Sequence, residues 1–224
     1  PCLRSAAWRD LATTRAGETG FQRMPWFTEV WRRLHATGAI YPCDKSRKDV
    51  ERALSAPHAE DDAEPIFPAS LRPSSDAGRE ALDPGSTNWR FRVPDGGIIG
   101  FMDAIRGAQR FTAGTDFGDF LVWRKDGMPA YELSVVADDH AMGVTEVVRG
   151  ADLLLSTARQ LLIFQALGWA PPAWAHAPLI TDATGRRLAK RTAGLSIREL
   201  RGRGFSPEAV LNEDLARRAD DSGT

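Results

Sequence analysis

The chain has 224 residues, with 29 Lys and Arg against 30 Asp and Glu, and a formal net charge of -1. Hydrophobic residues make up 42% and charged residues 26%, which excludes a disordered or collagen-like chain and a wholly basic nucleic-acid binder. The two cysteines, Cys2 and Cys43, are too few for a disulfide framework.

The same composition predicts a cytoplasmic protein. The most apolar stretch, 153–167, contains Ser156, Arg159 and Gln160, so we expect no transmembrane helix and no membrane partner. The first ten residues lack the apolar run of a secretory signal. The chain begins with Pro rather than Met, which indicates either processing or a fragment of a longer reading frame.

The first half of the chain contains one clear helix and one clear strand. Over residues 25–37 apolar side chains recur at helical spacing, and Gly38 follows as a C-cap. Residues 56–88 are rich in proline and acidic residues, which is typical of loops or a reduced subdomain. Trp89, Phe91 and Val93 then alternate before a turn, which predicts a strand.

The second half alternates strands and helices, which favours an α/β fold. We predict strands at Phe120–Trp123 and Ala130–Ala137, and a shorter extended segment that ends at Arg149. Thr157 and Gln160 have capping-box spacing, and the apolar residues around them predict a helix over Ser156–Leu167. We expect Tyr131–Ala137 to be a buried strand of a parallel sheet with this helix packed on it.

An acidic pair follows the predicted strand at 130–137. Ligands of open α/β sheets bind outside the carboxyl ends of the strands, so Asp138 and Asp139, with His140 and Gly143 behind them, are candidates for ribose or substrate contacts. The alternative is a turn in which an aspartate caps the next helix.

A basic stretch near the C-terminus could bind phosphates. Between residues 186 and 205 it holds one acid, Glu199, and seven cations: Arg186, Arg187, Lys190, Arg191, Arg198, Arg201 and Arg203. Lys and Arg in a glycine-containing loop can neutralise the charge of a leaving pyrophosphate. The alternative is a solvated basic face.

Several segments, in this order, carry a family resemblance: ATGAIYPCDKSRKDV, STNWRFRVPDG, GDFLVWRKDGMPAYELSVVADDHAMGVTEVVRGADLLLSTARQLLIFQALGW and GRRLAKRTAGLSIREL. Together they resemble the glutamyl-tRNA synthetase family of class I aminoacyl-tRNA synthetases, and in particular its small glutamyl-queuosine branch, which lacks an anticodon-binding domain. The resemblance runs from about residue 21 to residue 207 and is dense over 118–200.

The resemblance implies a fold and a domain plan. The fold would be the second half of a Rossmann-like class I catalytic core with a small inserted α+β subdomain of the acceptor-binding type. Residues 1–40 would be a helical remainder of the first half, 41–114 the insertion, 115–180 the second half, and 181–224 the signature loop with a helical tail.

The resemblance also implies a reaction. Members of the family activate glutamate with ATP, with Mg²⁺ expected alongside the nucleotide, and transfer the glutamyl group to tRNA. In the queuosine branch the acceptor is the modified base of the anticodon loop of tRNA(Asp). Two alternatives stay open, which are charging of the tRNA 3′ end and a non-catalytic remnant that binds tRNA or nucleotide.

Specific positions match the motifs of the family. Tyr131 in PAYELS and Arg149 in VVRGADL match residues that bind glutamate. Lys190 in RRLAKR matches the second lysine of the signature loop and would stabilise the leaving pyrophosphate as the catalytic residue, and Arg187 replaces the first lysine. Three further positions would border the nucleotide: Asp138, Asp139 and Gly143.

Two features of the family pattern are absent from the sequence. No His-Ile-Gly-His-type motif is present, and residues 1–20 match nothing in the family, so we expect the first half of the core to be missing. At the zinc positions of some members, only Cys43 is kept, and Lys45, Phe67 and Leu71 replace the other ligands. We therefore predict no bound zinc, with Ile66, Phe67 and Leu71 packing in its place.

Overall fold

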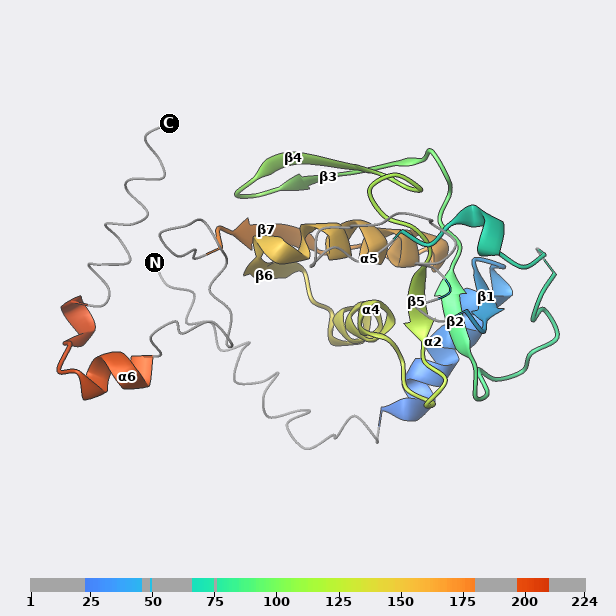
Figure 1. Ribbon diagram of the computed structural model, residues 1–224, viewed down its shortest axis with the longest axis horizontal. Coiled ribbons are helices and arrows are strands. Elements are labelled where there is room, and N and C mark those ends of the chain that lie inside the picture. Colours follow the sequence, from blue (N-terminus) through green and yellow to red (C-terminus); the bar gives the residue numbers. More distant parts are fainter. Residues whose placement is uncertain (1–22, 46–48, 50–65, 75, 180–196, 210–224) are drawn as a thin grey trace. The chain divides into compact units, whose positions relative to one another are not determined.

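The structure is a computed structural model that describes residues 23–45, 49, 66–74, 76–179 and 197–209 (Figure 1). The chain divides into two compact units, Pro1–Ala177 and Pro178–Thr224. Within the described residues, the second unit contributes helix α6 (Ile197–Gly202), and all the elements named below belong to the first.

Helix α2 (Met24–Ala36) confirms the helix predicted over residues 25–37. Pro25 lies in its first turn, where a missing N–H breaks no hydrogen bond. Gly38 follows the helix with a φ of 74°, a left-handed conformation that glycine adopts without strain. The buried face consists of four residues of the predicted apolar stripe: Phe27, Val30, Trp31 and Leu34.

Three short strands form an antiparallel sheet in the order β1-β2-β5, with bounds Ile40–Cys43, Asn88–Phe91 and Phe120–Trp123. Strands β2 and β5 were both predicted, and β5 has the predicted bounds. The ring of Trp31 from α2 meets Trp89 from β2 edge to face, with 4.8 Å between ring centroids. Buried aromatic rings therefore join α2 to this sheet.

A second sheet has the strand order β4-β3-β7-β6. Strands β3 (Ile98–Asp103) and β4 (Gly107–Thr112) form an antiparallel hairpin, whereas β3 and β6 (Glu146–Gly150) each run parallel to β7 (Ala173–Ala177). This parallel arrangement confirms the α/β class. It also brings the carboxyl ends of β3, β7 and β6 to one edge of the sheet.

Residues 131–142 form helix α4 (Tyr131–Met142), so the predicted strand at Ala130–Ala137 is wrong. The valines of this segment favour a strand by propensity, but propensity is a weak preference that packing overrides. Leu133, Val136 and Ala137 are completely buried at a spacing of three and four residues, which is the pattern of one helix face.

The acidic pair therefore does not follow a strand. Asp138 and Asp139 lie near the C-terminal end of α4, and Gly143 ends that helix with a φ of 65°. The expectation that these three residues mark the carboxyl end of a strand is wrong for the same reason as the strand itself.

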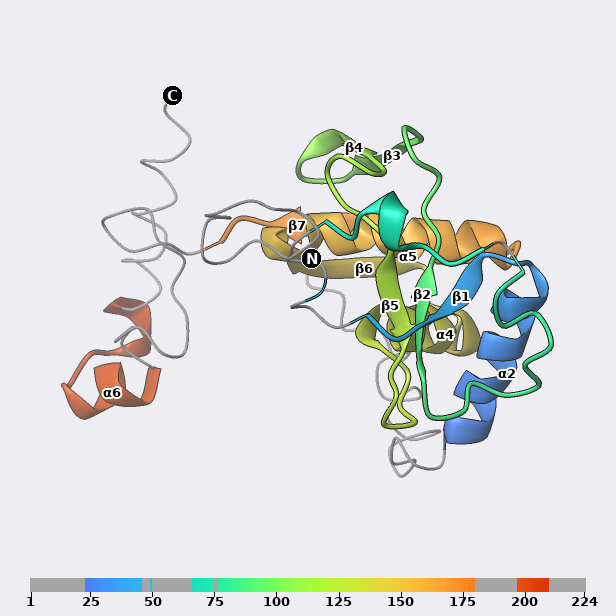
Figure 2. The same cartoon turned by 45° about the vertical axis from the view of Figure 1, so that its right-hand side comes forward.

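Helix α5 (Leu154–Ala166) confirms the helix predicted over 156–167, but it begins two residues earlier, after a 3-10 turn, η2 (Ala151–Leu153). Thr157 and Gln160 are consequently buried inside the helix rather than forming a capping box at its start. Figures 1 and 2 show the β3–β4 hairpin on one side of α5 and α4 on the other.

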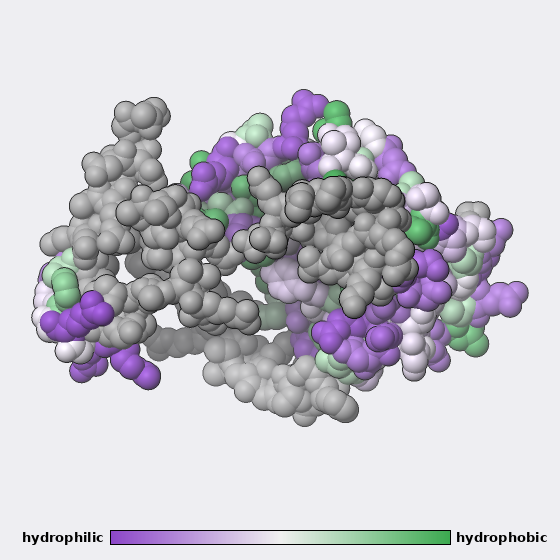
Figure 3. Space-filling model, in the orientation of Figure 1, coloured by the Kyte–Doolittle hydropathy of each residue, from purple (hydrophilic) through white to green (hydrophobic). Residues whose placement is uncertain are grey.

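Apolar side chains are not gathered on the visible surface. In Figure 3 the described residues are mostly white to purple, with separate green groups along the upper edge, where Figure 1 draws the β3–β4 hairpin. Ile98, Met102 and Ile105 of this hairpin are exposed. Among the described helices, none has the length and hydropathy needed to cross a bilayer.

The loop around η1 (Ala69–Leu71) is held by a buried ion pair. Arg72 donates from Nε and Nη2 to the two carboxylate oxygens of Asp119, each at 2.7 Å, and the Asp119 side chain is fully buried. Tyr41 Oη and the Val93 N–H also donate to Asp119, at 2.6 and 2.8 Å. One carboxylate therefore joins the loop to β1 and to the segment after β2.

Apolar packing reinforces this attachment. Phe67 is buried in a cluster with Tyr41 and Cys43, and Leu71 packs against it, which confirms the packing predicted for Phe67 and Leu71. A Cβ atom at Gly118 would lie 2.5 Å from the Phe67 nitrogen, so only glycine allows the two segments to approach this closely.

We predict that Arg72→Ala lowers the free energy of unfolding by about 3–5 kcal/mol, because it leaves the buried Asp119 carboxylate without its cation. The matched control is Arg79→Ala, which removes an exposed ion pair with Asp76 and should change stability by about 0.5 kcal/mol or less. Urea unfolding measures both variants. Equal effects would show that the Arg72 pair does not hold the loop.

A second prediction concerns Glu132 in the first turn of α4, which is 6% exposed. Burial raises the pKa of its carboxyl group, and hydrogen bonds from Ser156 and Gln160 and the charge of Arg159 only partly oppose this. The folded state thus binds its proton more tightly than the unfolded state, and stability falls as pH rises from about 4.5, the ordinary pKa, through the folded value.

Glu132→Gln removes this titration, so the variant should gain stability relative to the parent chain between pH 4 and pH 7. Unfolding free energies at the two pH values measure the gain, and Glu146→Gln, at an exposed position on β6, should show none. A gain for Glu132→Gln that is the same at both pH values would contradict the assignment.

Candidate functional site

Three polar side chains lie at the carboxyl ends of three neighbouring parallel strands. Asp103 is the last residue of β3, Arg149 is the fourth of the five residues of β6, and His176 has the same place in β7. Arg149 and His176 are partners in the β6–β7 register. Ligands of open α/β sheets bind outside this edge, so we take this cluster as the candidate site.

Asp103 and His176 form a buried pair. His176 Nδ1 lies 2.6 Å from Asp103 Oδ2, and both side chains are completely buried. Asp103 Oδ1 accepts hydrogen bonds from the backbone N–H groups of Ile105, Arg106 and His176, at 3.0, 2.8 and 3.2 Å. Burial alone would raise the pKa of Asp103, but the bonds from His176 and from these backbone groups outweigh it and lower the pKa. The side chain is therefore an ionised carboxylate.

Arg149 is surrounded by neutral acceptors. Its Nε donates to His176 Nε2 at 3.1 Å, and its Nη2 donates to Thr157 Oγ1 at 2.6 Å, to Gln160 Oε1 at 2.9 Å and to the Leu153 carbonyl at 3.4 Å. A guanidinium can only donate, so His176 Nε2 is the unprotonated ring nitrogen. The ring proton consequently lies on Nδ1 and is donated to Asp103.

The charge of Arg149 is not paired inside this part of the chain. Among the described residues, no carboxylate oxygen lies within 4 Å of its guanidinium, and Nη1 makes no hydrogen bond. Asp139 and Glu132 interact with it only at longer range. A half-buried guanidinium held in this way can bind a carboxylate through the N–H groups of Nη1.

The start of α5 supplies two of the acceptors. Because η2 directly follows β6, α5 begins beside Arg149, and the three-residue spacing of Thr157 and Gln160 places both on the same helix face. Gln160 also donates from Nε2 to Glu132 Oε2 at 2.8 Å, so the cluster continues into α4.

Of the residues predicted from the sequence, Arg149 lies at the centre of this cluster. Tyr131 is the first residue of α4 and is half exposed, and within the described residues no hydrogen bond joins it to Arg149. It is connected to the cluster through the adjacent Glu132. Lys190 and Arg187 lie outside the described residues.

The two aspartates of the predicted nucleotide site are placed differently. Asp138 pairs with Arg23 at 2.5 Å, at the start of α2, and so joins two helices. Asp139 is partly buried, which raises the pKa of its carboxyl group, and the charge of Arg149 opposes this. Gly143 follows at the end of α4. The structure therefore places Asp139 within electrostatic range of Arg149.

The other four residues of the cluster were not predicted from the sequence as site residues: Asp103, His176, Thr157 and Gln160. Asp103 and His176 belong to strands that were not predicted. One signal for them was available, since each is a lone polar or charged residue at the end of a short apolar run, in IIGFMD and AWAHA. Thr157 and Gln160 were predicted to form a capping box, in which their side chains would hydrogen-bond to backbone N–H groups.

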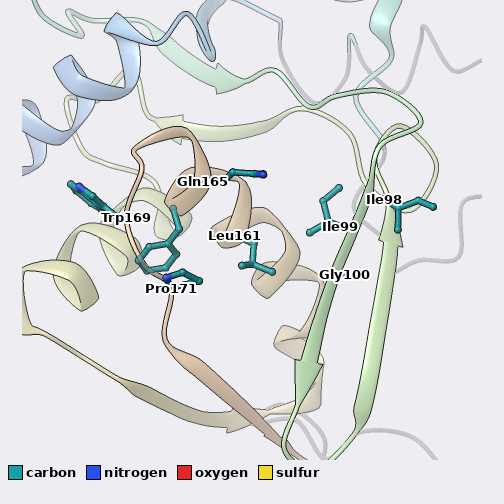
Figure 4. A pocket seen from close by; sticks show the side chains of 8 residues that line it. Ile98, Ile99, Gly100, Leu161, Gln165, Trp169 and Pro171 are labelled. Atoms are coloured by element: carbon teal, nitrogen blue, oxygen red, sulfur yellow. The ribbon is translucent and has the colours of Figure 1, made fainter.

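The structure also has a cavity of about 350 Å³ between β3 and the C-terminal part of α5 (Figure 4). It is lined by Ile98, Ile99, Gly100, Leu161, Phe164, Gln165, Trp169 and Pro171. None of these side chains is titratable, and neither Arg149 nor His176 is among them. Within the described residues no group of three or more His, Cys, Asp or Glu side chains could hold a metal ion.

Comparison with known proteins gives consistent matches. Residues 20–219 match the model of the family described as tRNA synthetases class I (E and Q), catalytic domain. A glutamyl-Q tRNA(Asp) synthetase of Symbiobacterium thermophilum is 43% identical over 193 residues, which cover 85% of this chain and 59% of the relative. A glutamate–tRNA ligase of Halorhodospira halophila is 40% identical over 194 residues, which cover 86% of this chain and 40% of the relative.

The fold has a solved counterpart. The crystal structure of a glutamate tRNA ligase from Elizabethkingia meningosepticum, in complex with its amino acid, has a TM-score of 0.60 and 25% identity, over 83% of this chain and 37% of that one. The chain thus spans about 60% of the glutamyl-Q relative and less than half of the glutamate–tRNA ligases. By its sequence and its fold, the chain belongs to the class I tRNA synthetases (E and Q).

Proposed function

We propose that this chain supplies the glutamate-binding part of a catalytic domain that activates glutamate with ATP and transfers the glutamyl group to tRNA. The observation that carries the proposal is the Arg149 guanidinium, which is fixed at the carboxyl end of β6 with no carboxylate partner among the described residues. A substrate carboxylate is the group that would complete it. Tyr131 would form a wall of the pocket that holds the glutamate.

The phosphate chemistry is assigned to other residues. Lys190, assisted by Arg187, would neutralise the pyrophosphate that leaves ATP, and Mg²⁺ would accompany the nucleotide as part of the substrate. Asp139 and Gly143, at the end of α4, would border the nucleotide. Asp138 would act there only indirectly, because its carboxylate pairs with Arg23.

We further propose that the catalytic domain is incomplete in these 224 residues. Within the described residues, β6 pairs with β7 alone, and its Val148 is 67% exposed. An open edge of a parallel sheet can accept another strand. The missing His-Ile-Gly-His-type motif, and the 59% of the glutamyl-Q relative that the chain spans, agree with this.

For the acceptor we favour queuosine in tRNA(Asp), and a cytoplasmic location follows from that substrate. Relatives named glutamyl-Q tRNA(Asp) synthetase are 39–43% identical to this chain, and the glutamate–tRNA ligases are 37–41% identical. Charging of the tRNA 3′ end by a glutamate–tRNA ligase is the second candidate. In either case the exposed Arg198, Arg201 and Arg203 of the second unit are suited to RNA phosphates.

Glutamate-dependent exchange of pyrophosphate into ATP tests the activation step. We expect this chain alone to exchange at least about 10²-fold more slowly than the Symbiobacterium relative, because the phosphate contacts of a whole motif are absent. A form extended upstream along its reading frame should regain exchange and lose it again with Arg149→Ala. Exchange by the 224-residue chain at the rate of the relative would contradict the proposal of an incomplete domain.

The acceptor is tested with the extended form and two altered tRNAs. tRNA(Asp) that lacks its 3′-terminal adenosine but carries queuosine should accept labelled glutamate, and complete tRNA(Asp) without queuosine should not. The opposite result would assign the chain to the enzymes that charge the 3′ end.

A further inference from the structure

The Asp103–His176 pair contacts Arg149 at Nε, whereas Nη1 has no partner among the described residues. We propose that this pair positions the Arg149 guanidinium for the substrate carboxylate, with His176 as the positioning residue and Asp103 as its anchor. The inference rests on the proposed function, because it requires that Arg149 binds glutamate.

The hydrogen bonds that run from Arg149 through His176 to Asp103 have defined directions. Asp103 Oδ1 is held by three backbone N–H groups, which leaves Oδ2 to accept the Nδ1 proton of His176. The carboxylate thereby fixes the tautomer, and His176 Nε2 is left with a lone pair that accepts Arg149 Nε–H at 3.1 Å. Rotation of the guanidinium about its own axis would break this bond.

The other contacts define the plane of the guanidinium. Thr157 Oγ1 and Gln160 Oε1 accept from Nη2. The Thr157 hydroxyl lies 3.2 Å from the Leu153 carbonyl and 3.1 Å from His176 Nε2, and either atom can accept its proton. Nε and Nη2 are thus both fixed from the protein side. Of the three nitrogens, only Nη1 has no partner among the described residues.

A neutral histidine has an electrostatic advantage over a carboxylate in this place. A carboxylate in direct contact would pair with Arg149 and compete with the substrate. Because His176 stands between Arg149 and Asp103, the guanidinium is oriented by a strong acceptor and keeps its charge for a ligand. The carboxylate acts on the guanidinium only through the ring.

The same pair has a structural role that an experiment must separate from positioning. Strands β3 and β7 share a single register pair, Asp103 with Trp174, so the Asp103–His176 bond also holds the hairpin to the sheet. Loss of stability after substitution of His176 would therefore not distinguish a positioning role from a structural one. The informative comparison uses two side chains that differ in where they place an acceptor atom.

The test is the dissociation constant of L-glutamate, measured by equilibrium dialysis on the 224-residue chain. In His176→Gln the Oε1 atom can reach the place of Nε2, whereas in His176→Asn the amide reaches only the place of Nδ1. We expect His176→Gln to bind within about threefold of the parent, and His176→Asn to bind about 10-fold to 100-fold more weakly. Equal affinities of the two variants would overturn the proposal.

A second variant keeps the test valid if the His176 variants fail to fold. Thr157→Val preserves shape and removes one acceptor of Nη2, and it should weaken glutamate binding about 10-fold. The control Glu146→Gln, on the exposed surface of β6, should leave binding unchanged. Unchanged binding by Thr157→Val would count against positioning by the acceptors.

The ¹⁵N NMR spectrum of the His176 ring provides a readout that needs no ligand. We expect Nδ1 to be protonated and Nε2 unprotonated in the parent chain, and Asp103→Asn to move the proton to Nε2. A protonated Nε2 in the parent would overturn the positioning role, whether or not glutamate binds. A different outcome would separate the two proposals. If the ring has the expected tautomer but Arg149→Ala binds glutamate as tightly as the parent chain, then Arg149 does not bind glutamate, and the proposed function is wrong.

Discussion

A single buried carboxylate, Asp103, determines the arrangement of the candidate site. It lies at the carboxyl end of β3, where burial would favour its neutral form, and the hydrogen bonds of His176 and of three backbone N–H groups keep it ionised. Since its second oxygen must be satisfied by His176, the tautomer of that ring follows, and so does the orientation of Arg149. The position of the guanidinium is thus fixed by a residue that it does not touch.

A second buried carboxylate, Asp119, fixes the arrangement of several segments in another part of the first unit. It accepts hydrogen bonds from Arg72, from Tyr41 and from the Val93 N–H. The two carboxylates differ in their partners, however. Asp119 neutralises its arginine directly, whereas Asp103 is separated from Arg149 by a neutral ring. That difference agrees with a structural role for Arg72 and a binding role for Arg149.

Part of this arrangement could be predicted from the sequence. The helix at 24–36 and strand β5 were predicted because their apolar patterns have a single interpretation, and Arg149 was identified by its motif. Helix α4 was missed because consecutive valines are typical of a buried strand. Only the three- and four-residue spacing of Leu133, Val136 and Ala137 distinguishes a helix from a strand here. Asp103 and His176 are brought next to Arg149 by the order of strands β3, β7 and β6 in the sheet. No local sequence pattern predicts this strand order.

The proposed site requires that a carboxylate reach Arg149 Nη1, which has no partner among the described residues, and a crystal structure of the chain with L-glutamate tests this most directly. We expect one carboxylate of the ligand to accept hydrogen bonds from Arg149 Nη1, with the bond from Arg149 Nε to His176 Nε2 unchanged. Glutamate bound elsewhere, or bound at Arg149 only after the guanidinium has left His176, would contradict it.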